Sequence, residues 1–329
     1  MKKFLVAVLS AVLMGVTALG FSACANESAG IEVFVPDGAP ALAIAQLMAE
    51  ENNFGQDVNY HVVDANSITT HVTYEDMNRN ADICVLPVND ASKLCDGASY
   101  KMLGTVTHGN LYLVSATEKA ALTRENFAEE ISGKKVGVVQ MSKFPGALTK
   151  LVLNEYGVSD SVTLQAVQPA EVTGVGSDFD YFVIPEPAAS TRVGNANLNL
   201  RQAGSMQELY GGQSGYPQAV LVAKNSLIDS DPEFITQFTS AVVSNAQWLL
   251  DDNVSTETIL SAIKSHYPDP ENTTPAFNKL TKSVIKNCAV SFVGAADCKE
   301  EVKTFLTKLK NTDPAFASEV ADGFFYING

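Results

Sequence analysis

The apolar positions of the chain fall into short runs separated by segments with helical spacing. Short apolar runs are typical of buried strands, and they occupy residues 31–35, 58–63, 83–88, 101–114, 135–139, 162–167, 181–184 and 218–223. Most intervals between these runs have a helical period, as in 146–156, where Leu148, Leu151 and Val152 share one side. Strands alternating with helices predict an α/β architecture with largely parallel sheets.

The last third of the chain has a different pattern, in which helical spacing dominates. Pro232 predicts the start of a long helix over 232–252, because proline is favoured in the first helical turn. Asp297 and Glu300 have the spacing of a capping box and predict a second helix over 297–310. We therefore expect late helices to cover a fold built mainly from earlier strands.

The start of the chain has the pattern of an export signal. Two lysines precede the apolar run 4–21, and small residues lead to Cys24, which predicts a secretory signal peptide over 1–23. A membrane span is the alternative, but Ala, Gly, Ser and Thr dilute the run, and a span needs about 20 strongly apolar residues. The stretch FSAC also resembles a bacterial lipobox, in which Cys24 is lipidated and 24–30 forms a tether.

Composition narrows the class of protein. The chain has 329 residues with 46% hydrophobic content, enough for a large core that divides into two domains. Its net charge is −15, and loss of the signal leaves 20 basic against 37 acidic residues, near −17. Such a charge is repelled by nucleic acid and by anionic lipid head groups, so neither is an expected partner.

Four cysteines follow Cys24, in two locally spaced pairs. Cys288 and Cys298 bracket the stretch AVSFVGAAD, which reads as a turn between two helices, and in an exported protein this predicts a disulfide. Cys84 lies within an apolar strand, so Cys84 and Cys95 fit either a second disulfide or buried thiols. No CxxC motif is present, and the sequence predicts no metal site and no cofactor.

Six loops at the ends of predicted strands share an unusual composition. Each combines proline or glycine with a polar or aromatic residue: PDGAP, PVNDAS, VTHGNLY, MSKFPGA, PEPAAS and GYPQA. One such loop would be an ordinary turn. In open α/β sheets, however, ligands gather where strand ends feed helices, so six loops at equivalent places predict a ligand-binding cleft.

These motifs, in their order and spacing, resemble a known family. PDGAPALAIAQL, ADICVLPVNDASKL, GTVTHGNLYLV, GKKVGVVQMSKFPGALTKLVL, IPEPAAS and YPQAVLVAKNSL are similar to segments of the substrate-binding lipoproteins of ABC importers. The branch is the one that serves nitrate, sulfonates, taurine and thiamine pyrimidine precursors. The resemblance extends over nearly all of the mature chain.

The resemblance implies a fold and a working context. The fold is that of type II periplasmic binding proteins, with lobe one at 31–107 plus 217–329 and lobe two at 108–216. Two chain crossings join the lobes, near 107–113 and 204–217. The implied protein is an exported monomer, anchored through Cys24 on the outer face of the cytoplasmic membrane or in the periplasm. Its implied partners are a small-molecule ligand and the ABC permease and ATPase subunits.

The family pattern also implies which residues line the cleft. Carried over position by position, it identifies Asp37, Gly38, Ala39, Pro40, Asn89, Thr107, His108, Asn110, Phe144, Pro145, Glu186 and Tyr216.

Each candidate also has a structural interpretation. Asp37 could face the cleft, with Pro40 starting a helix whose free N–H groups point to the ligand, or it could only complete the turn. Asn89 could bind ligand or cap a helix, and Phe144 could stack on a flat ligand or pack against its neighbours. Glu186 stands between two prolines, where a carboxylate has little structural purpose.

The acidic candidates bear on the ligand. Asp37 and Glu186 lie in loops whose only nearby cation is Lys143, which favours an amine or an amino-substituted heteroaromatic ring such as a thiamine pyrimidine precursor. A sulfonate, taurine or nitrate held by N–H groups is the alternative. An enzyme of the pyrimidine-precursor synthase type and a surface adhesin are alternatives of other classes. The chain lacks HExxH, Gly-x-Ser-x-Gly and a cysteine-rich iron motif, so we expect no catalysis.

Overall fold

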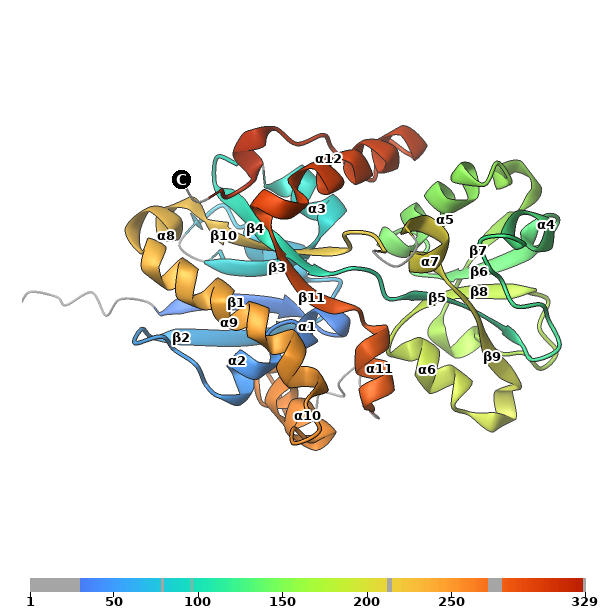
Figure 1. The fold of residues 1–329 in the computed structure, drawn as a ribbon, viewed down its shortest axis with the longest axis horizontal. Helices are drawn as coiled ribbons and strands as arrows, with labels where there is room; N and C mark the ends of the chain where they lie inside the picture. Colours follow the sequence, from blue (N-terminus) through green and yellow to red (C-terminus); the bar gives the residue numbers. More distant parts are fainter. Residues whose placement is uncertain (1–29, 78–79, 96, 212–214, 272–279, 328–329) are drawn as a thin grey trace, which may run out of the picture.

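Two mixed β-sheets with helices around them make up the protein (Figure 1). The computed structural model describes residues 30–77, 80–95, 97–211, 215–271 and 280–327. The first sheet has the order β11-β4-β10-β3-β1-β2, with strands β1 (Ile31–Pro36), β2 (Val58–Val63), β3 (Ile83–Pro87), β4 (Tyr100–Thr107), β10 (Ala219–Lys224) and β11 (Val290–Gly294). The second has the order β7-β6-β8-β5-β9, with strands β5 (Leu111–Ala116), β6 (Lys135–Val139), β7 (Thr163–Val167), β8 (Tyr181–Pro185) and β9 (Leu200–Ser205).

The chain passes between the sheets twice, from β4 to β5 and from β9 to β10. The two passages lie side by side, because Tyr216 N donates to His108 O (3.3 Å) and Gln218 N donates to Thr107 O (3.0 Å). Both run through the middle of the molecule in Figure 1. The signal region 1–29 lies outside the described residues, and within the described ranges no helix is long and apolar enough to span a membrane.

Helices cover both sheets. Those that follow strands of the first sheet are α1 (Ala39–Leu42), α2 (Ala45–Ala49), α3 (Val88–Leu94), α8 (Asn225–Ser230), α9 (Pro232–Leu250), α10 (Thr256–Ser265), α11 (Lys282–Asn287) and α12 (Ala295–Thr312). Those of the second half are α4 (Phe127–Ile131), α5 (Phe144–Glu155), α6 (Ala188–Val193) and α7 (Met206–Gly211). Short 3₁₀ turns are η1 (Ile68–Val72), η3 (Ser159–Ser161), η4 (Pro169–Glu171), η5 (Ala196–Leu198) and η6 (Asp322–Phe324).

The predicted α/β alternation is confirmed, but the sheets are mixed rather than largely parallel. In the first sheet β1 pairs parallel with β2 and β3, and in the second β6 pairs parallel with β7 and β8. The strand that follows each passage runs the other way: β10 is antiparallel to β3 and β4, and β5 is antiparallel to β8 and β9. These antiparallel pairs are thus a consequence of the chain entering each sheet from the other, whereas β11, which is antiparallel to β4, follows α11.

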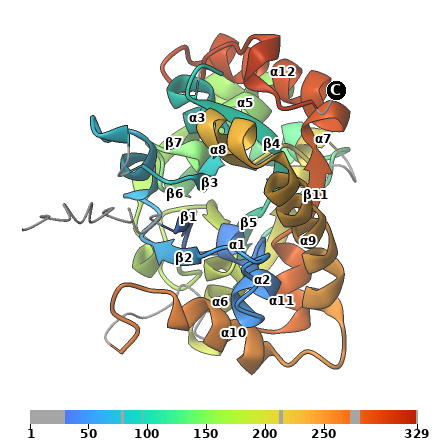
Figure 2. The same ribbon diagram turned by 90° about the vertical axis from the view of Figure 1, so that its left-hand side faces the viewer.

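The uncharged segment after β1 is buried on all sides, as its composition predicts, but it is broken into α1 and α2. Helix α2 packs against α9 and α10, Figure 2 shows it between them, and α1 contacts α10. At the break, Asn245 of α9 accepts a hydrogen bond from Gln46 N (2.8 Å) and donates to Leu42 O (2.8 Å). One fully buried amide therefore satisfies two backbone groups that a continuous helix would pair internally.

Two other predictions of elements are wrong, and a third is confirmed for the helix but wrong for its start and its cap. The predicted strand 101–114 is two strands, because the chain changes sheets between them. The stretch after Cys288 is not a turn but strand β11, which pairs with β4. The helix expected over 297–310 begins two residues earlier, with Gly294 as its N-cap and no side-chain capping bond, so Asp297 and Glu300 form no capping box.

The predicted disulfide between Cys288 and Cys298 is also wrong. Both thiols are free and buried, as are those of Cys84 and Cys95. Strand β11 lies between Cys288, at the end of α11, and Cys298, in the first turns of α12, and it carries them into different hydrophobic clusters. The two cysteines are therefore separated by the extended strand β11, and not by the turn that the sequence predicts.

Candidate functional site

Several predicted residues meet where the two sheets face each other, around the two chain passages. Asn110 O accepts from Glu186 N (2.8 Å), and Asn110 Oδ1 accepts from Gln218 Nε2 (2.6 Å). The Phe144 ring lies 5.8 Å from that of Tyr216. Residues from the first passage, the second passage and two loops of the second sheet thus form one group, which we call the junction cluster: Asn110, Phe144, Glu186, Gln207, Tyr216 and Gln218.

Glu186 is the charged member of the junction cluster. It follows β8 and is only 2% exposed. Its carboxylate accepts from Ser190 N (3.0 Å), Ser190 Oγ (2.7 Å) and Asn287 Nδ2 (3.0 Å). Within the described part of the chain these are its side-chain hydrogen-bond partners, and neither residue carries a charge. A buried carboxylate held only by neutral donors leaves a negative potential that a cation would stabilise.

The contact with Asn287 joins the two halves of the molecule. Asn287 ends α11, which packs with α9 on the first sheet, whereas Glu186 belongs to the second. Tyr112 of β5 donates to Asn287 O (2.9 Å) beside it. Burial, followed by the Glu186 charge, raises the pKa of Tyr112 and of the Cys288 thiol, so both groups stay protonated next to the carboxylate.

Four polar atoms around the passages are buried and lack a hydrogen-bond partner in the described structure. They are Asn89 Oδ1, Gln207 Oε1, Tyr216 Oη and Gln218 Oε1. Asn89 joins the others through its neighbour, since Val88 N donates to Gln218 O (2.9 Å). Natural proteins rarely leave such groups unsatisfied, and exceptions concentrate at sites with a function.

The orientation of the amides makes these atoms acceptors. Asn89 Nδ2 donates to Asp90 Oδ1 (3.1 Å), which fixes Oδ1 on the other side. Gln218 Nε2 donates to Asn110 Oδ1, which likewise leaves Gln218 Oε1 as the open atom. The unpaired hydrogen-bonding atoms in this region are therefore mostly amide carbonyl oxygens, which bind groups that donate hydrogen bonds.

Tyr216 is fully buried, and its hydroxyl is the fourth open atom. Burial raises its pKa, and the backbone N–H groups of Leu111 and Asn110, which lie near without completing a hydrogen bond, offset that rise only in part. Gly109 permits this arrangement: its φ is +112°, and a Cβ there would lie 2.8 Å from Gln207 Cβ and 3.0 Å from the Tyr216 ring. Only glycine fits the passage at this point.

Other predicted residues have structural partners. Thr107 is fully buried and its hydroxyl accepts from Ala219 N (3.1 Å), which ties the passages together. A ring nitrogen of His108 lies 3.2 Å from Thr105 Oγ1, and burial lowers the pKa of His108. Phe144 packs on Tyr216 and lies 6.1 Å from Phe305, with Pro145 buried behind it.

The loop after β1 has local hydrogen bonds of its own. Asp37 is half-buried, donates its N–H to Val63 O (2.8 Å) and accepts from Gly38 N (2.7 Å). Gly38 takes a φ of +101°, and Ala39 and Pro40 begin α1, which has only four residues. These contacts support the turn interpretation, and a role of this loop in binding stays a prediction.

The sequence interpretation missed Gln207, Gln218 and Asn287. Gln218 lies in the GYPQA loop, whose composition predicts a cleft position, but its own side chain has no signal in the sequence that distinguishes it from Tyr216. Asn287 and Gln207 belong to helical segments without a motif, and only the fold brings them to the passages. Across the described ranges no group of three His, Cys, Asp or Glu could hold a metal ion.

Comparison with known proteins supports the fold and no closer relation. No protein-family model matches the chain, and no curated protein matches it. Among solved structures, it is similar to one from Parabacteroides distasonis described as an ABC transporter, with a TM-score of 0.70, 20% identity, and coverage of 91% of this chain and 99% of that one.

Two further structures bear on the architecture. The periplasmic aliphatic sulphonate binding protein of Escherichia coli has a TM-score of 0.60 at 12% identity, covering 91% of this chain and 92% of that chain. A Candida albicans protein described as having the generic periplasmic binding protein fold has a TM-score of 0.51 at 12% identity, covering 90% and 93%. The predicted periplasmic-binding-protein fold is confirmed.

Proposed function

We propose that this protein is the extracytoplasmic solute-binding component of an ABC importer. It would capture a small molecule between its two halves and deliver it to a membrane permease driven by an ATPase. The fold, the order of the sequence motifs and the meeting of polar residues at the chain passages support this function. The halves would act as lobes, with 31–107 plus 217–329 forming lobe one and 108–216 lobe two.

The ligand we propose is an amine or an amino-substituted heteroaromatic molecule, such as a thiamine pyrimidine precursor. The observation that carries it is the charge and polarity of the junction cluster. Glu186 is a buried carboxylate with neutral partners, and the open atoms around the same chain passages include three amide oxygens. Such a set suits a ligand that donates hydrogen bonds and carries positive charge.

A sulfonate, taurine or nitrate is the alternative ligand in the same fold. The similar Escherichia coli protein is named for binding aliphatic sulphonates. An anion, however, would need N–H or cationic groups where this chain has carbonyl oxygens and a carboxylate. Binding of an anion would therefore require that Glu186 lie outside the ligand contact.

Calorimetry on residues 24–329 with Cys24→Ala tests the proposal. The aminopyrimidine precursor of thiamine should bind, and Glu186→Gln should weaken it by roughly 2–5 kcal/mol, the usual cost of removing one partner of a desolvated charge pair. Glu129→Gln, an exposed change on α4, is the control and should have no effect. If an alkanesulfonate binds and Glu186→Gln leaves its affinity unchanged, the alternative ligand is favoured. If neither the aminopyrimidine nor the alkanesulfonate binds, the result argues against the proposed function.

We also propose that lipid on Cys24 anchors the protein outside the cytoplasmic membrane and that it works as a monomer without catalysis. The anchor precedes the folded part, so Cys24→Ala should release the protein from membranes with an unchanged melting temperature. Persistent membrane association of that variant would indicate an uncleaved span. Turnover of any bound molecule by the purified protein would support the enzyme alternative instead.

A further inference from the structure

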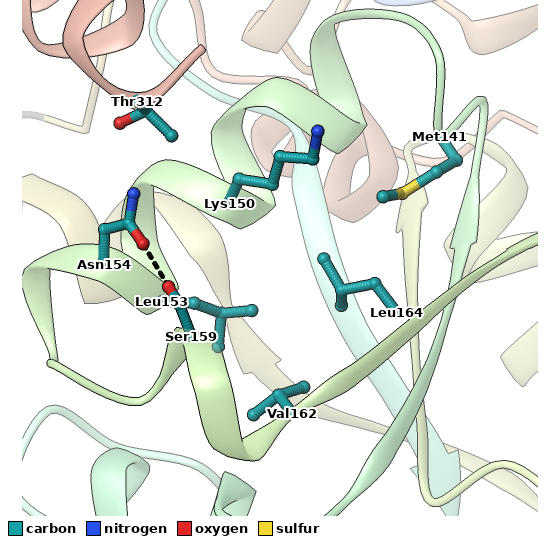
Figure 3. Close-up of a pocket in the computed structure, with 8 residues that line it drawn as sticks. All are labelled: Met141, Lys150, Leu153, Asn154, Ser159, Val162, Leu164 and Thr312. Atoms are coloured by element: carbon teal, nitrogen blue, oxygen red, sulfur yellow. Dashed lines mark hydrogen bonds between the residues drawn. The ribbon is translucent and has the colours of Figure 1, made fainter.

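A pocket of about 330 Å³ lies away from the junction cluster, between α5, the start of β7 and the end of α12 (Figure 3). Four of its lining side chains are apolar: Met141, Leu153, Val162 and Leu164. Figure 3 shows them converging on one space below the Lys150 side chain. The volume is near the lower end of the range for small-molecule sites, roughly 300–1,000 Å³.

The apolar floor lies on an edge strand. β7 pairs only with β6 in the described sheet, and its outer face is largely exposed. Val162 and Leu164 are partly buried there and pack against the large core cluster from its margin. Apolar side chains beside an open strand edge favour a covering group, and a ligand chain of the right length would provide one.

The polar rim offers donors. Lys150 Nζ lies 3.2 Å from Asp313 Oδ2 and 5.1 Å from the centre of the Phe316 ring, and the Lys150 side chain is 37% exposed. Asn154 Oδ1 accepts from the Ser159 hydroxyl, which leaves the Asn154 amide nitrogen as a donor within the described chain. Thr312 donates its own hydroxyl to Lys308 O (3.0 Å). The rim therefore presents an ammonium and an amide N–H above an apolar floor.

We propose that this pocket is a second ligand site, which takes a short aliphatic carboxylate. The hydrocarbon chain lies on Met141, Val162 and Leu164, and the carboxylate pairs with Lys150. Without ligand, the Asp313 carboxylate pairs with the Lys150 ammonium. A partly exposed ion pair is weak, so a ligand carboxylate whose hydrocarbon chain is also buried can replace Asp313. The site is independent of the solute proposed for the junction cluster.

The site also has a place in the whole molecule. Lys150 belongs to α5 on the second sheet, whereas Thr312 and Asp313 end the helix that packs on the first. A ligand carboxylate that pairs with Lys150 therefore replaces the Lys150–Asp313 ion pair, which joins the two halves. Occupancy of the pocket therefore acts on one of the contacts between α5 and the end of α12.

Titration with octanoate, monitored by calorimetry or by chemical-shift changes of the Met141 methyl group, tests the proposal. Lys150→Met keeps the aliphatic stem and should weaken octanoate binding about tenfold or more, which corresponds to about 1.4 kcal/mol. Asp313→Asn removes the competitor and keeps an oxygen for Ala315 N, so it should strengthen binding. Octanol should bind with little change in either variant, because it lacks the charge.

Val162→Phe fills the pocket and should weaken both probes, with circular dichroism confirming that the variant is folded. The proposal is overturned if octanoate fails to bind the unmodified chain below millimolar concentration. It is equally overturned if Lys150→Met and Asp313→Asn leave octanoate affinity unchanged, which would indicate adventitious binding of the chain alone.

Discussion

The hydroxyl of Tyr216 is the group for which an effect on stability and an effect on ligand binding can be separated most clearly. It is buried, and no described group pairs with it at full hydrogen-bond geometry, although the backbone N–H groups of Leu111 and Asn110 lie close enough to offset part of the rise in its pKa, so the fold gains little from it. Tyr216→Phe should leave the free energy of unfolding unchanged or raise it by about 1 kcal/mol, and should weaken binding of the solute. Urea unfolding and calorimetry on the same variant measure the two effects.

Tyr100 provides a matched control for that substitution. Its ring is equally buried, but its hydroxyl donates to Ala81 O (2.6 Å). Tyr100→Phe should therefore lower the free energy of unfolding by about 1–3 kcal/mol and leave solute affinity unchanged. If both variants lose stability equally and neither loses affinity, Tyr216 is a structural residue.

The four cysteines of the folded part are predicted to behave as buried thiols. Burial raises the pKa of the Cys84, Cys288 and Cys298 thiols, so little thiolate forms at neutral pH. In a Cys24→Ala variant, a thiol reagent should react slowly with native protein and titrate four thiols after denaturation. Reductant should not move the melting temperature. A count of fewer than four thiols would indicate that a disulfide is present.

Among the elements, strands rich in apolar residues were predictable from the sequence and strands that depend on a partner were not. β9 has the sequence LRQAGS, in which Arg201 and Gln202 interrupt any apolar run, and it becomes a strand because β5 lies beside it. β11 is only partly buried and forms through pairing with β4, near 200 residues earlier in the chain. Local pattern contains no information on such distant partners.

Helix α12 is the element that ties the halves together. Figure 1 shows it reaching from the first sheet toward α5. Its Phe305 is 1% exposed and lies 5.4 Å from the Tyr210 ring and 6.0 Å from that of Tyr216. Lys308 adds an ion pair with Glu155 (2.6 Å).

Truncating Phe305 should therefore be costly. Phe305→Ala leaves a cavity between the halves and should lower the free energy of unfolding by about 3–5 kcal/mol, as measured by denaturant titration. Thr307→Ala, on the exposed side of the same helix, is the control and should stay within about 0.5 kcal/mol. A small loss for Phe305→Ala would mean that the aromatic contacts between the halves are dispensable.

At the scale of the molecule, the sequence predicted where the candidate site lies better than what completes it. The loops containing Asn110, Glu186 and Tyr216 do meet at the passages. Of the partners that define the chemistry, Gln218 lies in the same predicted loop as Tyr216 but has no signal of its own, and Asn287 comes from α11, whose position depends on the fold. Their role follows from tertiary placement, which one sequence without its fold does not specify.

We propose that the two halves together capture a small molecule that donates hydrogen bonds. Native mass spectrometry tests it most directly, on residues 24–329 with Cys24→Ala, stripped by unfolding, refolded and exposed to the small-molecule fraction of the host's growth medium. We expect one added mass, which is identified after release as an amine or amino-heteroaromatic compound and is lost in Glu186→Gln but not in Glu129→Gln. A spectrum containing only the unliganded protein, or an adduct that both variants retain equally, would contradict it.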